Sequence, residues 1–123
     1  MANVERLELL IDVLKRVPRK EFDMRDWWCG TAGCAIGHAA QDARFQELGL
    51  ALEANPIPCL AEFMVPTIDG KQAFQNDLGR FFGISTIEAE VFYPGHYEKH
   101  GRRITPKDVI KAIHGLLIFE RTE

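Results

Sequence analysis

The sequence has no long hydrophobic run. Glu5, Glu8 and Asp12 interrupt the only apolar stretch before residue 20, so a secretory signal peptide is not expected. No window approaches the roughly 18 consecutive apolar residues that a membrane span needs. We therefore expect a protein that is not secreted and does not use a membrane as its partner.

Cysteine and positive charge are also scarce. There are three cysteines, an odd number without the spacing of a disulfide framework, which is typical of a protein in the reducing cytoplasm. Fifteen Lys and Arg residues oppose 18 Asp and Glu residues, for a net charge of −3, and this balance disfavours nucleic acid as a partner. No complete catalytic or cofactor motif occurs, so no cofactor is expected.

Helical periodicity is the main pattern that the sequence does contain. Its 123 residues, 46% of them hydrophobic, are enough for one core and predict a single domain over residues 1–123. Asn3 is placed to cap a first helix, which Pro18 should end. The apolar positions of that helix repeat at helical spacing: Val4, Leu7, Leu10, Ile11 and Leu14.

A stretch of small residues after two tryptophans is the most unusual part of the chain. It predicts a helix from Ala32 to Ala43 with Thr31 as its N-cap. Cys34, His38 and Asp42 lie four residues apart and should form one stripe of that helix. A thiol, an imidazole and a carboxylate on one stripe are candidate catalytic groups.

Three interpretations of this stripe are open. Cys34 and His38 can be structural, because free cysteine is among the most buried residue types. They can also form a metal site with Cys29, which needs a fourth ligand because structural zinc is four-coordinate. The candidates for that fourth ligand are Cys59, His96, His100 and His114. Finally, Cys34 can be a nucleophile that His38 activates, with Asp42 assisting.

The middle of the chain predicts a hairpin and then a helix. Two apolar runs, 48–53 and 60–65, flank a turn-rich segment with two prolines. Asp69 followed three residues later by Gln72 indicates a helix start, and Gly83 is placed to end that helix. Its predicted buried stripe is Phe74, Leu78, Phe81 and Phe82.

The last third of the chain predicts two more helices. Ser85 and Glu88 form a capping box for a short helix that runs through Phe92. Thr105 and Asp108 form a second box, with Pro106 at the first helical position. The apolar face of this last helix is Val109, Ile110, Ile113, Leu116, Leu117 and Phe119, with His114 as a hydrogen-bonded residue at its edge.

Together these elements predict a mainly α (α+β) fold. It is a compact bundle of about five helices around the small-residue helix, with a small β-hairpin beside it.

Three surface features are further candidates for ligand binding. Trp27 and Trp28 are expected in a loop over the start of the central helix, where they either fill the core or line a site. The segment after residue 95 combines ring and cationic side chains: His96, Tyr97, His100, Arg102 and Arg103. The third feature is a basic patch after the first helix, which either complements the helix dipole or binds phosphate. It consists of Lys15, Arg16, Arg19 and Lys20.

Five blocks of sequence carry a resemblance to known proteins. They are FDM at 22–24, CGTAGCAIGHA at 29–39, FFGI at 81–84, EAEVFYPGHY at 88–97 and ITP at 104–106. In this order they resemble a set of small uncharacterised bacterial and phage-associated proteins. The resemblance implies a common fold and a common central helix, and no particular chemistry.

The leading hypothesis is a non-enzymatic cytoplasmic binding or interaction module, with a prophage association. Its partner would be a protein or a small molecule, and a homo-oligomer is compatible with the sequence. The alternative is a Cys/His site on the central helix, either a thiol-dependent hydrolase or a metal centre. A helix-turn-helix DNA binder is disfavoured, because the helix after Ser85 carries Glu88 and Glu90 and no basic residue.

Overall fold

A computed structural model describes residues 3–22, 34–54, 64–93, 96–97 and 104–121. Within these ranges the chain forms five α-helices and one three-stranded antiparallel sheet. In chain order the elements are α1 (Val4–Lys15), η1 (Arg19–Glu21), α2 (Ala35–Ala40), α3 (Ala43–Glu47), β1 (Leu50–Ala54), β2 (Met64–Ile68), β3 (Lys71–Gln72), α4 (Gln75–Phe82), η3 (Glu88–Phe92) and α5 (Pro106–Arg121), where η marks a 3₁₀-helix.

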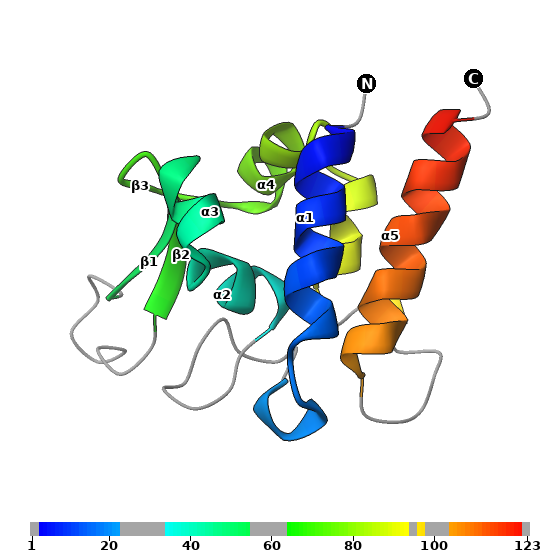
Figure 1. The fold of residues 1–123 in the computed structure, drawn as a ribbon. Helices are drawn as coiled ribbons and strands as arrows, with labels where there is room; N and C mark the ends of the chain where they lie inside the picture. Colours follow the sequence, from blue (N-terminus) through cyan, green and yellow to red (C-terminus); the bar gives the residue numbers. More distant parts are fainter. Residues whose placement is uncertain (1–2, 23–33, 55–63, 94–95, 98–103, 122–123) are drawn as a thin grey trace.

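The two longest helices, α1 and α5, lie side by side and antiparallel, and α2 packs on α1 from its other side (Figure 1). The sheet lies beyond α2 and contacts it through both β1 and β2. The fold is therefore mainly helical α+β, as predicted, and its sheet has three strands rather than the two of the predicted hairpin. No helix in the described ranges is long and apolar enough to cross a membrane.

Helix α1 confirms the prediction for the first helix. The Asn3 side chain accepts a hydrogen bond of 3.1 Å from the backbone N–H of Arg6, as an N-cap should. One face of the helix is buried in the core: Leu7, Leu10, Ile11, Val13 and Leu14.

The predicted central helix is divided into two short helices. Helix α2 begins after Cys34, which occupies its N-cap, and the predicted cap Thr31 lies outside the described residues. The chain leaves helical geometry at Asp42, whose extended backbone places it at the N-cap of α3. Its carboxylate accepts a bond of 2.8 Å from the N–H of Arg44. Aspartate competes for backbone donors in this way and so favours caps over helix interiors.

The predicted hairpin is present, but its second strand lies further along the chain. Strand β1 pairs with β2 in antiparallel register, with Leu50 opposite Ile68. Asp69 and Gly70 then adopt positive φ angles of 53° and 83° and form a tight turn into β3, as the turns of short hairpins require. The prediction that Asp69 starts a helix is therefore wrong.

Helix α4 starts later than predicted and buries three of the four expected side chains. Its N-cap is Phe74, whose N–H donates to the Asp77 carboxylate over 2.9 Å. Phe74 itself is 59% exposed and does not join the buried stripe. Gly83 ends the helix in the left-handed region, with φ 68°, as predicted.

An aromatic cluster joins α4 to α3 and η3. It consists of Phe45, Phe81, Phe82 and Phe92, with ring centroids 5.0 to 6.2 Å apart. These distances suit the edge-to-face and tilted contacts that aromatic rings prefer. All four rings are buried.

Both predicted capping boxes after α4 are confirmed. Ser85 and Glu88 exchange backbone-to-side-chain bonds of 2.9 and 3.0 Å and open η3, which is a 3₁₀-helix. At α5 the Asp108 carboxylate accepts a bond of 2.8 Å from the N–H of Thr105. Because each box involves residues only three positions apart, the sequence is sufficient to predict it.

Candidate functional site

Cys34 lies in the core at the start of α2. It is 1% exposed, and the N–H of Gly37 donates to its Sγ over 3.5 Å. The thiol therefore acts as a helix N-cap, in the place that serine or aspartate more often takes. A solute cannot reach this sulfur without local opening of the fold.

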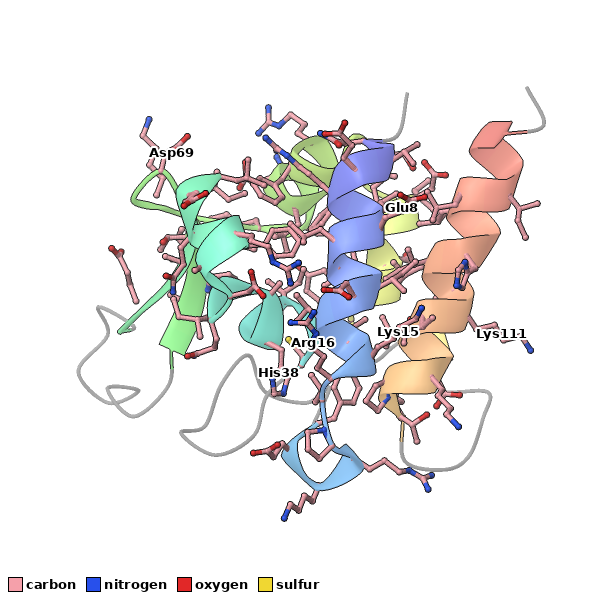
Figure 2. All side chains as sticks on the ribbon, viewed as in Figure 1. Glu8, Lys15, Arg16, His38, Asp69 and Lys111 are labelled. Carbon is pink, nitrogen blue, oxygen red and sulfur yellow. The ribbon has the colours of Figure 1, made fainter. Side chains whose placement is uncertain are left out.

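His38 points from α2 towards η1 (Figure 2). Its Nε2 lies 2.6 Å from the backbone carbonyl oxygen of Glu21. Since a carbonyl can only accept, Nε2 carries a proton and donates it. The imidazole also stacks on Phe22, with centroids 6.2 Å apart and planes 17° apart. These contacts fix His38 to the segment that follows α1.

Asp42 does not share a helix with Cys34 and His38, so the predicted stripe of three side chains is not formed. The Asp42 carboxylate pairs with Arg44 over 3.0 Å, and Arg44 also reaches Asp12 of α1 over 3.0 Å. The hydrogen bond from the Arg44 side chain holds the pKa of Asp42 below its ordinary value. Arg44 thus links α3 to Asp12 of α1, and Asp42 is the charged carboxylate that pairs with Arg44 at the start of α3.

The described residues contain no group of three His, Cys, Asp or Glu side chains that could hold a metal ion. Three of the metal candidates and five of the ligand-binding candidates lie outside those residues, with His100 in both sets. These seven are Cys29, Cys59, Trp27, Trp28, His100, Arg102 and Arg103. His96 and His114 are exposed, and His114, which was predicted to be hydrogen-bonded at the edge of the apolar face of α5, forms no hydrogen bond within the described residues.

Tyr97 is buried, although it was a candidate ligand-binding residue. It is 3% exposed, and its hydroxyl donates a 2.7 Å hydrogen bond to the carbonyl of Val91. Burial raises the pKa of Tyr97, so the phenol stays neutral and holds η3 in place. His96 packs edge-on against its ring at 4.8 Å.

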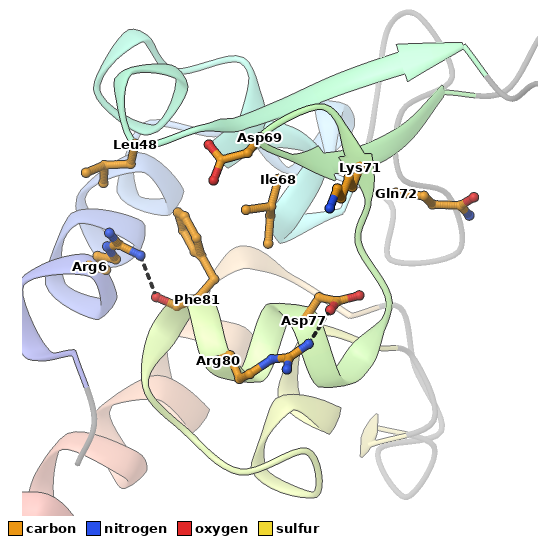
Figure 3. A pocket seen from close by; sticks show the side chains of 9 residues that line it. All are labelled: Arg6, Leu48, Ile68, Asp69, Lys71, Gln72, Asp77, Arg80 and Phe81. Atoms are coloured by element: carbon orange, nitrogen blue, oxygen red, sulfur yellow. Dashed lines mark hydrogen bonds and ion pairs between the residues drawn. The ribbon is translucent and has the colours of Figure 1, made fainter.

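A pocket of about 380 Å³ opens between α1, the sheet and α4 (Figure 3). This volume lies within the usual range of small-molecule sites, about 300–1,000 Å³. Leu48, Ile68 and Phe81 supply its apolar lining, and the other lining residues are polar or charged. These are Arg6, Asp69, Lys71, Gln72, Asp77 and Arg80.

The wall formed by α1 and α4 is fixed by contacts within the protein. The Arg6 guanidinium lies 4.3 Å from the centroid of the Phe81 ring and donates a 2.9 Å bond to the Phe81 carbonyl. Arg80 pairs with Asp77 over 2.6 Å. The N–H of Phe74 and then Arg80 keep the pKa of Asp77 low, so this carboxylate is charged at neutral pH.

The wall formed by the sheet carries two charged side chains that have no partner within the described residues. Asp69 and Lys71 extend from the β2–β3 turn and β3 into the pocket (Figure 3). Within the part of the chain that the structure describes, neither side chain forms a hydrogen bond or an ion pair. A carboxylate and an ammonium are therefore both available to a ligand beside an apolar surface.

Sequence reasoning did not identify this pocket. Arg6 and Phe81 are 75 positions apart in the chain, and the only interpretation given to Asp69 was that of a helix start. The Asp-Gly pair at 69–70, a hairpin-turn signal, was the local feature that could have identified the sheet wall.

No family model, curated protein or solved structure matches the chain.

Proposed function

We propose that this chain is a non-enzymatic binding module that holds a small zwitterionic ligand in the pocket of Figure 3. The observation that carries the proposal is the pair of unused opposite charges, Asp69 and Lys71, in one pocket. The ligand's ammonium would pair with the Asp69 carboxylate, and its carboxylate with the Lys71 ammonium. A free amino acid or a similarly sized zwitterion has this chemistry.

The remaining lining supports the same ligand class. Arg6 uses one guanidinium nitrogen for the Phe81 carbonyl, and its other N–H donors suit a carboxylate. Leu48 and Ile68 offer an apolar surface for a short side chain. Because the Arg6 and Arg80 side chains are already anchored, the site is largely pre-formed, which lowers the entropic cost of binding.

Two features of α2 support a binding module over a thiol hydrolase or a metal centre. Cys34 is buried and caps the helix, and His38 donates to a backbone carbonyl. We propose that α2 is the centre of a helical bundle, since it packs against α1, α3 and the sheet. A cytoplasmic location and a prophage association are part of the same proposal, supported by the cysteine count and the five sequence blocks.

The test is a titration of the ¹⁵N-labelled full chain with each of the common amino acids, followed by amide chemical shifts. We expect at least one amino acid to shift the amides around Asp69 and Lys71 and to saturate in the millimolar range or below. Asp69→Asn keeps the turn, because asparagine tolerates positive φ, and Lys71→Met keeps the side-chain length. Each should weaken binding about tenfold.

Two matched variants serve as controls. Glu90→Gln on η3 and Lys111→Met on α5 remove the same charges from exposed positions outside the pocket. They should leave the affinity unchanged. The proposal is wrong if no amino acid shifts these amides, or if all four variants bind alike.

A further inference from the structure

A second pocket lies between the end of α1 and the start of α5. Its volume is about 320 Å³, and it shares no lining residue with the pocket of Figure 3. Two residues of the basic patch, Lys15 and Arg19, line it from one side, and Lys107 lines it from α5. Figure 2 shows Lys15 in the space between these two helices.

The charged side chains of this pocket are all basic. No carboxylate is part of its lining, and the nearby Asp108 accepts bonds from both the N–H and the hydroxyl of Thr105 in the capping box. Neither Lys15 nor Lys107 forms an ion pair with any residue that the structure describes. Positive charge is thus gathered at one place in a chain whose net charge is −3.

The helix dipoles account for the position of Lys15 but not for that of Lys107. Lys15 lies in the last turn of α1, where the negative end of the dipole favours a cation. Lys107 is the second residue of α5, where the positive end of the dipole disfavours one. Lys107 shares the pocket with Lys15, and neither forms an ion pair within the described residues, so their like charges add repulsion that a bound anion would relieve.

The uncharged lining is mainly apolar. Leu14 and Pro106 are buried, and Val17 and Ile110 are partly buried at the pocket wall. An inorganic ion alone would leave this surface exposed to water. An anionic group attached to a short apolar body would cover it and gain the free energy of apolar burial.

We propose that this pocket binds a small amphiphilic anion, a carboxylate or a phosphate monoester on a hydrocarbon body. The anionic group would lie among Lys15, Arg19 and Lys107, and the hydrocarbon against Val17 and Ile110. Lysine ammonium groups act as point charges, whereas the arginine fork suits both planar carboxylate and phosphate oxygens. This site is separate from the zwitterion pocket, and its failure or success leaves that proposal unaffected.

The experiment titrates the ¹⁵N-labelled full chain with four probes: hexanoate, hexyl phosphate, inorganic phosphate and hexanol. We expect the first two to shift the amides of Lys15, Val17, Lys107 and Ile110, with an affinity that falls as salt is added. The tighter of the two identifies the anionic group. Inorganic phosphate or hexanol binding as tightly as hexyl phosphate would overturn the proposal, and so would the absence of any shift.

Charge variants test the role of the lysines. Lys107→Gln and Lys15→Gln should each weaken binding about fivefold. Lys111→Gln is the matched control, because Lys111 is exposed on the same helix and points away from α1 (Figure 2); it should bind as the parent does. Thermal melting completes the test, because Lys107→Gln removes repulsion and should melt no lower than the parent. A lower melting temperature for it, or equal binding by all three variants, would overturn the proposal.

Discussion

Replacing Cys34 by serine and by alanine separates a structural cysteine from a chemical one. In the structure its Sγ accepts from the N–H of Gly37, the third residue of α2, and both residues are buried. Serine keeps an acceptor at the N-cap, whereas alanine removes it and leaves that N–H without its side-chain acceptor. The structural role therefore predicts a definite order of stability, with the serine variant above the alanine variant.

The magnitudes follow from the cap and from burial. Loss of a capping acceptor costs about 1 kcal/mol, and leaving a buried donor unpaired adds to this, so Cys34→Ala should lose about 1.5–2 kcal/mol. Cys34→Ser should lose about 1 kcal/mol or less, because serine is a preferred N-cap but its hydroxyl replaces a buried sulfur. With a urea slope of about 1.5 kcal/mol/M, the alanine midpoint should fall by about 1 M.

The assay combines urea unfolding of the three proteins with alkylation of the parent. Because Cys34 is 1% exposed, iodoacetamide should modify it only after opening of the fold. An opening free energy of about 5 kcal/mol slows the reaction more than a thousandfold relative to the unfolded chain. Peptide mass spectrometry follows Cys34 separately from the other cysteines. An alanine variant as stable as the serine variant, or a Cys34 that is alkylated as fast in the folded as in the unfolded protein, would refute this reasoning.

Three further substitutions test the fold by urea unfolding. Tyr97→Phe removes the hydrogen bond to Val91 and should cost about 1–2 kcal/mol without changing either ligand titration; unchanged stability would contradict the structural role of the phenol. Thr67→Val should be neutral or stabilising by up to about 1 kcal/mol, because the buried Thr67 hydroxyl has no hydrogen-bond partner among the residues that the structure describes; a clear loss would indicate a partner. Gly49→Ala should cost about 1–3 kcal/mol, because Gly49 has φ 99° and a Cβ there would push the exposed Asp69 carboxylate aside. Gly70→Ala has a similar positive φ of 83° but no atom within 4 Å of its Cβ, so it is the control and should lose less, by the cost of moving that carboxylate.

Features that depend on neighbouring residues could be read from the sequence. Asn3, the Ser85 and Thr105 capping boxes and Gly83 all occur as predicted, because each involves atoms within one helical turn. The buried face of α1 also follows from spacing alone, since it needs only a period of 3.6 residues. The sequence therefore determined most helix ends and the α+β class.

Contacts with the rest of the fold determined the bounds of the other elements, where the local sequence fitted more than one structure. Small residues over 32–43 fit one long helix, but the Asp42 side chain binds the next turn and starts α3. Asp69 fits a helix cap by spacing, but Asp69 and Gly70 join two paired strands. Such alternatives lie close in local free energy, so pairing and burial elsewhere in the chain select between them.

Both pockets depend wholly on the tertiary structure. Arg6 contacts Phe81 across 75 positions, and Lys15 and Lys107 line one pocket only because α1 and α5 pack antiparallel. In the sequence, Lys15 and Arg19 are surface charges with an ordinary explanation, and Asp69 is a turn residue. Their chemistry arises where charged groups share one pocket with apolar side chains from other parts of the chain, and local periodicity carries no information about that placement.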